Sequence, residues 1–150
     1  MNDLKQIEEV LKEEGMFVST TAGISMYPML RNRRDTIVIE PYEGRLKKYD
    51  VPLYKVGSAY VLHRIIKVLP DSYVICGDNC DFKEYGITDE QILGVLTGFY
   101  RDDKQVDMKG WKYRLYVCLH CKTYPIRWFR GQIRRLRAKI GRWIKKGENK

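Results

Sequence analysis

A close series of strand-like runs between residues 35 and 101 constrains the fold of this chain most strongly. The runs are rich in Val, Ile, Leu and Tyr, which favour strands, and read DTIVIEP, DVPLYKV, YVLHRIIKVL, SYVICG and ILGVLTGFY. Gly, Pro, Asp or Asn separate them, and no clear helical period lies between them. This spacing predicts a coiled antiparallel sheet and argues against a parallel α/β fold. We therefore expect a mainly β fold, with a hairpin turn at residues 101–104.

Helices are expected on both sides of this β region. Near the amino terminus, Leu4, Ile7 and Leu11 follow helical spacing, with Asn2 or Asp3 as the N-cap and Gly15 as the stop. A short β-rich run follows at residues 17–21. The sequence thus predicts an N-terminal helix at 1–15, a β domain at 16–110 and a C-terminal segment at 111–150, which suits one compact domain with an appendage.

The C-terminal segment contains a basic amphipathic helix that begins just after Pro125. At about 100° per residue, its apolar side chains fall inside an arc roughly 100° wide: Ile126, Phe129, Ile133, Leu136, Ile140, Trp143 and Ile144. Trp128 is the one large apolar residue on the other face. Residues 111–150 hold 13 Lys and Arg and one acid, whereas residues 1–110 hold 15 bases and 18 acids. The basic character therefore belongs to this segment alone.

Three roles are open for this helix. Residues 125–146 could lie on an anionic membrane surface, with the apolar arc in the interface and the cations near the headgroups. The arc could instead pack on the β domain, leaving a solvated basic face. Nucleic acid or an acidic protein is the third and least favoured partner.

Composition limits the cellular setting. No uncharged apolar run approaches the roughly 18–20 residues that cross a bilayer, and the acidic, amphipathic start is unlike a signal peptide. We expect a cytoplasmic protein whose only membrane contact would be peripheral. In a reducing compartment Cys76, Cys80, Cys118 and Cys121 are expected as free thiols; a four-thiolate zinc site and a redox pair at 118–121 are weaker alternatives.

Three short stretches carry residues suited to nucleophilic catalysis. Ser25 follows a glycine at a strand-to-turn junction, His63 is one of two histidines, and Asp78 lies in a Gly-Asp-Asn turn. A serine hydroxyl needs a neighbouring base, an imidazole can take its proton near neutral pH, and a carboxylate can orient the imidazole. Taken singly, each residue is more often an ordinary turn or core residue.

In order along the chain, these stretches resemble the signature boxes of the signal peptidase I superfamily, which also contains the repressor-type self-cleaving serine peptidases. GISMYPML (residues 23–30) resembles the nucleophile box, LHRII (62–66) the base box and YVICGDN (73–79) the Gly-Asp-Asn box. DVPLY (50–54) and ILGV (92–95) resemble further strands of that fold. The likeness covers about residues 17–102.

The resemblance implies a coiled β serine peptidase with Ser25 as nucleophile, His63 as base and Asp78 as third member. It places the chain with the Ser/His branch, since most bacterial members have lysine at the base position. Gly23, Met26 and Pro28 of the nucleophile box are expected to contact substrate, whereas Arg64 is expected to be a structural charge. His120 lies in no box and is expected to be a surface or packing residue.

The expected substrate is an extended peptide lying along a sheet edge near residues 17–22, with small side chains near the cut, as the resemblance implies. Family members carry membrane-spanning anchors, and this sequence has no such run. The sequence therefore favours an endopeptidase that trims a leader or signal-like peptide, with no cofactor or metal. The alternative is a catalytically silent relative that binds a membrane, nucleic acid or an acidic partner through its basic helix.

Overall fold

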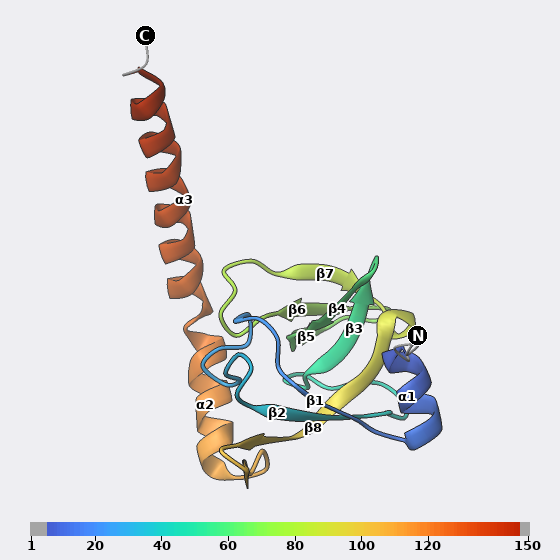
Figure 1. The fold of residues 1–150 in the computed structure, drawn as a ribbon. Coiled ribbons are helices and arrows are strands. Elements are labelled where there is room, and N and C mark those ends of the chain that lie inside the picture. Colours follow the sequence, from blue (N-terminus) through green and yellow to red (C-terminus); the bar gives the residue numbers. More distant parts are fainter. Residues whose placement is uncertain (1–5, 148–150) are drawn as a thin grey trace, which may run out of the picture.

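The structure, a computed structural model, describes residues 6–147 and all their side chains except those of residues 141 and 143–147. Figure 1 shows a β domain with two helices following it along the chain. The elements are α1 (Ile7–Glu14), β1 (Phe17–Thr20), β2 (Thr36–Glu40), β3 (Pro52–Val56), β4 (Ala59–Leu62), β5 (Arg64–Val68), β6 (Tyr73–Cys76), β7 (Glu84–Ile87), the 3-10 turn η1 (Asp89–Gln91), β8 (Ile92–Arg101), β9 (Lys104–Gln105), α2 (Trp111–Lys122) and α3 (Tyr124–Gly147).

The larger sheet is antiparallel and curls into a half-barrel. Its strands run in the order β1-β2-β8-β3-β4, and β9 forms a short hairpin with the end of β8. The hairpin turn expected at residues 101–104 is present, with Asp102 and Asp103 both at positive φ. The register shifts between Val38 and Ile39 and again between Leu53 and Tyr54. Such irregularities bend strands and help a sheet to coil.

The smaller sheet contains β5, β6 and β7, again antiparallel. The run at residues 60–69, which reads as one strand, is therefore divided. Leu62 ends β4 in the larger sheet, Arg64 begins β5 in the smaller sheet, and His63 lies between them. Because His63 lies between a strand of the larger sheet and a strand of the smaller sheet, its side chain is placed at the junction of the two sheets.

Each sheet has its own buried core. The core of the larger sheet takes Leu11 from α1 and includes Ile39, Leu53 and Phe99 from three strands. The core of the smaller sheet is centred on Ile65, Tyr73 and Ile75, with Tyr54 joining from β3. The sequence runs that predicted strands thus supply both cores, and the junction between the cores is where His63 lies.

The chain is less purely β than the sequence predicts. Strands account for about 32% of it and helices for about 30%, so a mainly β description fits only the part before residue 111. The additional helical content comes from α2, a helix that the sequence analysis did not predict. Its residues include Tyr113, Tyr116 and Val117, types that favour strands, but tertiary contacts outweigh such local preferences.

The two terminal helices follow the sequence pattern with small differences. α1 ends as expected at Gly15, which is left-handed at φ 70°. Its N-cap is Gln6, which forms a capping box with Glu9, and not Asn2 or Asp3; those two residues and Leu4 lie outside the described residues. α3 begins at Tyr124, one residue before Pro125.

α2 and α3 follow one another in nearly the same direction, and α3 extends away from the β domain (Figure 1). No helix in the described part of the chain is both long enough and apolar enough to cross a lipid bilayer.

Candidate active site

Ser25 lies in a turn that follows the edge strand β1. The turn begins at Gly23, whose φ of 89° is costly for any residue with a side chain, and the Gly23 amide donates to Oδ1 of Asn32. The Tyr27 amide donates a hydrogen bond to the carbonyl of Ile24, which closes the turn. These contacts hold Ser25 half-buried in the turn that follows β1.

His63 is buried, with 6% of its surface exposed, and its ring is held at one nitrogen. Nδ1 lies 2.7 Å from Oε1 of Glu84 and 3.1 Å from the hydroxyl of Tyr54. Tyr54 comes from β3 and Glu84 from the first position of β7, so two strands, one from each sheet, position this imidazole. With Nδ1 occupied, Nε2 is the nitrogen left for chemistry.

Tyr54 supports this arrangement as a neutral hydroxyl. It is fully buried, and burial, followed by the charge and hydrogen bonding of Glu84, raises the pKa of its hydroxyl well above the ordinary value. The hydroxyl therefore stays protonated. The Tyr54 hydroxyl and Oε1 of Glu84 both contact Nδ1 of His63, so the orientation of the ring is fixed from two sides.

Gly77 is the point where the turn that carries Ser25 meets the imidazole of His63. A Cβ atom at this position would lie 2.8 Å from the carbonyl oxygen of Ser25, 2.9 Å from Nε2 of His63 and 2.6 Å from Sγ of Cys80. These distances are shorter than real Cβ contacts. Only glycine fits here, and the missing side chain is what allows Ser25 and Nε2 of His63 to approach the same place.

Ser25 and His63 also line one cavity of about 440 Å³. Its walls include Phe17, Ser19 and Thr20 of β1 and residues 60–62 of β4. These strands are the two ends of the larger sheet, so the cavity is a groove between its open edges. Among the hydrogen bonds of the described residues, none joins the Ser25 hydroxyl to His63; catalytic hydrogen bonds are often long until substrate binds.

The structure does not place Asp78 beside His63, which corrects the expected third member. Asp78 is 3% exposed, and its carboxylate accepts hydrogen bonds from Nε and Nη2 of Arg64 at 2.9 and 2.8 Å. The Tyr116 hydroxyl donates to the same carboxylate at 2.9 Å. With both oxygens already bound to a buried guanidinium, Asp78 is a structural partner of Arg64, and Glu84 takes the position next to the imidazole.

Arg64 is therefore a buried structural charge, in line with its expected role. Burial alone would lower the pKa of its guanidinium, but the hydrogen bonds and charge of Asp78 outweigh that effect and raise it. Arg64 also donates to the backbone carbonyl of Tyr49 and to the hydroxyl of Tyr113. The pair joins β5 to the Gly-Asp-Asn turn and to α2.

Asn79, the last residue of the Gly-Asp-Asn turn, holds the turn that carries Ser25 in place. Its amide donates to the carbonyl of Ser25 at 2.7 Å, and its side-chain Nδ2 donates to the carbonyl of Ile24 at 3.1 Å. The Gly-Asp-Asn turn thus positions the backbone next to Ser25, whereas its Asp78 carboxylate binds Arg64.

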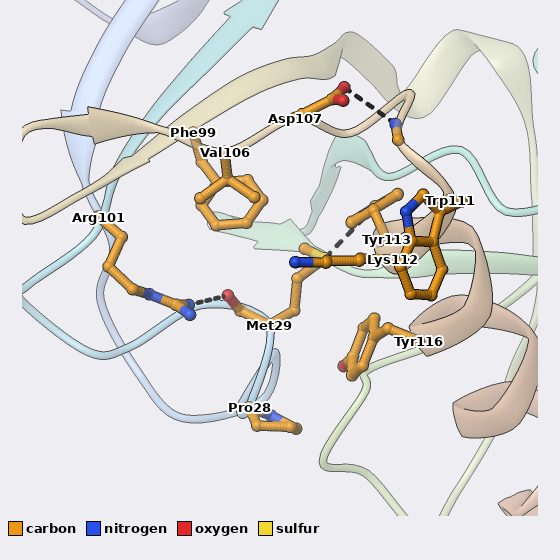
Figure 2. Close-up of a pocket in the computed structure, with 11 residues that line it drawn as sticks. Pro28, Met29, Phe99, Arg101, Val106, Asp107, Trp111, Lys112, Tyr113 and Tyr116 are labelled. Atoms are coloured by element: carbon orange, nitrogen blue, oxygen red, sulfur yellow. Dashed lines mark hydrogen bonds between the residues drawn. The ribbon is translucent and has the colours of Figure 1, made fainter.

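Two of the three expected substrate contacts lie at the groove. Gly23 and Met26 line it, whereas Pro28 lines a different cavity of about 510 Å³. Figure 2 shows this second cavity between Phe99 and Arg101 of β8 and Trp111 and Tyr113 of α2. Pro28 is separated from the groove because the turn continues past Ser25 toward α2.

Glu84 and α2 were missed by the sequence reasoning. Glu84 is the first residue of the short strand β7, whose sequence, EYGI, matches no catalytic motif. His120 is a packing residue of α2: its ring stacks on Tyr116, with 5.1 Å between ring centroids, and Nε2 meets the backbone carbonyl of Asp78 at 2.5 Å. An i, i+3, i+4, i+7 pattern at Tyr113, Tyr116, Val117 and His120 was the available signal for α2.

The cysteines give no metal site in the described part of the chain. Cys76, Cys80, Cys118 and Cys121 are free thiols, and no cluster of three or more potential metal ligands occurs among the described residues. Cys76 is buried with its Sγ donating to the carbonyl of Phe82, and burial raises the pKa of its thiol to about 12. The zinc alternative finds no support here.

No protein-family model and no curated protein matches this chain. The resemblance to the signal peptidase I superfamily therefore rests on the sequence motifs alone.

Proposed function

We propose that this protein is a serine endopeptidase that resembles signal peptidase and uses Ser25 as nucleophile and His63 as general base. The observation that carries the proposal is that Ser25 and the imidazole of His63 line one groove, with Nε2 facing the Ser25 turn across Gly77. A serine hydroxyl and an imidazole from distant parts of the chain, brought to the end of a substrate-sized groove, match the arrangement that acyl transfer requires.

The reaction begins with transfer of the Ser25 hydroxyl proton to Nε2 of His63 as Oγ attacks the scissile carbonyl carbon. The imidazolium then gives that proton to the leaving amine as the C–N bond breaks and an acyl-enzyme forms. Water, deprotonated by His63, hydrolyses the ester and restores Ser25. Glu84 accepts a hydrogen bond from the Nδ1–H group of His63 and stabilises the positive imidazolium.

Backbone amides beside Ser25 are suited to stabilise the oxyanion. Within the hydrogen bonds made by the described residues, the amides of Ser25 and Met26 have no acceptor. Amides that are free and fixed in place can bind the developing negative charge, and a donor of this kind lowers the barrier by about 3–4 kcal/mol in other hydrolases.

The edges of the sheet indicate an extended peptide substrate. β1 and β4 are the two end strands of the larger sheet, and both line the groove. A peptide in the groove can add as a strand to either edge, gaining backbone hydrogen bonds there. Small residues such as alanine near the cut, and a leader or signal-like peptide as substrate, follow from the family resemblance.

Labelling with a serine-directed acylating inhibitor tests the proposal. We expect one modified residue, Ser25, and loss of the label in both Ser25→Ala and His63→Ala. Ser19→Ala is the matched control, because Ser19 lines the same groove and its hydroxyl already donates to the neighbouring carbonyl of Thr20. This variant should label normally.

Peptide cleavage gives the second readout. The Ser25→Ala and His63→Ala variants should each lose about 10⁶-fold in kcat, as observed when such a unit is broken. Cleavage that survives in both variants, or a label on another residue, contradicts the assignment. No label and no cleavage of any peptide in a library would favour the catalytically silent binding module instead.

A further inference from the structure

Eight large apolar side chains form an exposed stripe along α2 and α3. The members, named here the apolar stripe, are Trp111, Leu115, Leu119, Ile126, Phe129, Ile133, Leu136 and Ile140. Each is at least 36% exposed. A contiguous exposed apolar face of this length is unusual on a soluble surface and indicates a binding partner.

The β domain contacts α3 on the side opposite to this stripe. Gly131 is the one buried residue among the α3 residues whose side chains the structure describes, and a Cβ there would collide with the carboxylate of Asp81. Asp81 also pairs with Arg135 at 2.8 Å and Arg134 at 3.5 Å. At about 100° per residue, Gly131 lies about 180° around the helix from the middle of the α3 part of the stripe.

α2 has the same arrangement. Its inward side carries Val117, which is buried, and Tyr116, whose hydroxyl binds Asp78. Leu115 and Leu119 lie on its outward side, whereas Trp111, at the start of α2, is exposed beside the cavity that β8 and α2 share. α3 continues in nearly the direction of α2 (Figure 1), and seven residues, close to two helical turns, separate Leu119 from Ile126. The members of the apolar arc whose side chains the structure describes are therefore exposed, and the β domain does not cover them.

Positive charge borders the stripe. α3 holds nine Lys and Arg and no acid between Tyr124 and Gly147. On a helical projection Arg130 and Arg137 lie beside one margin of the stripe and Lys139 beside the other. All three side chains are exposed. Long cationic side chains in such positions can reach outward to phosphate groups while the apolar residues between them enter the interface.

We propose that the apolar stripe of α2 and α3 binds the surface of an anionic lipid membrane, with α3 lying in the plane of the interface. A second copy of the chain is a poorer occupant, because it would bring two strongly cationic helices together. Nucleic acid would satisfy the charge but would leave the apolar side chains in water. Of these three occupants, the anionic lipid surface is the one that matches both the stripe and its cationic borders.

Vesicle flotation with the full-length chain tests this inference. We expect the protein to float with vesicles of phosphatidylcholine mixed with phosphatidylserine, to remain behind with phosphatidylcholine alone, and to be released as salt increases. The triple variant Phe129→Ser, Ile133→Ser, Leu136→Ser should reduce the bound fraction by about tenfold or more. All three side chains are exposed, so the thermal unfolding of the variant should match the parent.

Two controls make the result specific. Trp128→Ser removes a comparable apolar side chain outside the stripe and should leave flotation unchanged. Ser25→Ala should also leave it unchanged, so that membrane binding and peptidase activity are judged separately.

Four outcomes would overturn the inference. They are no flotation with phosphatidylserine vesicles, equal flotation of the triple variant, a dimer in solution that the triple variant disperses without any flotation, and RNA or DNA binding that the triple variant retains without any flotation.

Discussion

Oε1 of Glu84 lies 2.7 Å from Nδ1 of His63. Glu84 is the first residue of β7 and is paired in register with Ile75 of β6, one strand away from β5, which begins next to His63. A carboxylate fixed on a strand holds the imidazole in the tautomer that leaves Nε2 as the base. This contact gives the proposed peptidase a Ser25-His63-Glu84 arrangement.

Glu84→Gln should lower kcat by up to about 10⁴-fold with little change in KM, because an amide can no longer fix the tautomer or stabilise the imidazolium. Glutamine keeps the shape of the side chain, so the free energy of unfolding should change little. The measurement is steady-state cleavage of a reporter peptide together with urea unfolding. A Glu84→Gln variant with the activity of the parent would remove Glu84 from the mechanism.

Asp78→Asn should act on stability. The substitution leaves the buried Arg64 guanidinium without its counter-charge, and breaking such a pair costs about 3–5 kcal/mol. Asp102→Asn is the matched control: it breaks an exposed pair with Arg34, which contributes about 0–1 kcal/mol. Urea denaturation of both variants measures the difference. If both variants lose the same small amount of unfolding free energy, the Arg64–Asp78 pair does not stabilise the fold.

Gly77→Ala should abolish cleavage because its Cβ would displace the Ser25 carbonyl or Nε2 of His63. Adding Cys80→Ala should not restore activity, since the Ser25 contact is with backbone. Gly98→Ala on β8 is the control, because its Cβ would meet only Gln105 at 3.7 Å. The readouts are peptide cleavage and serine labelling. Full activity in Gly77→Ala would contradict the close approach of turn and base.

The buried thiol of Cys76 should make stability fall at alkaline pH. Burial raises its pKa from 9.0 to about 12, so the unfolded chain loses this proton first as pH rises. The contribution is full below about pH 9 and is lost progressively up to about pH 12. Since Tyr73 also has its pKa raised to about 12 by burial, the comparison with Cys76→Ala isolates the thiol. Urea unfolding across this range should give a shallower pH dependence for the variant, and identical slopes would contradict it.

Much of the local structure could be predicted from sequence. The strand runs at 35–41, 50–56, 72–77 and 92–100 each hold a strand of the structure. Gly15 ends α1, and the helix after residue 123 carries the expected amphipathic pattern. These features depend on side-chain periodicity and on special residues such as glycine, and both act over a few neighbouring positions.

The sequence was less informative where a contact spans the chain. It predicted Ser25 and His63, and the structure places both at one groove. The turn motif predicted that the carboxylate beside His63 belongs to Asp78. In the structure, the pairing of β7 with β6 places the carboxylate of Glu84 there instead. The helix α2 was missed because its aromatic and β-branched residues favour strands and become helical against the Arg64–Asp78 pair.

By itself the sequence determined most of the strands, the first and last helices, the two candidate residues at the groove and the amphipathic, cationic character of the C-terminal helix. Tertiary structure alone decided which carboxylate meets His63 and which face of α3 meets the β domain. The physical reason is that both depend on the spatial arrangement of segments far apart in the chain. Asp81 draws the cationic face of α3 inward, and the apolar stripe is left on the outside.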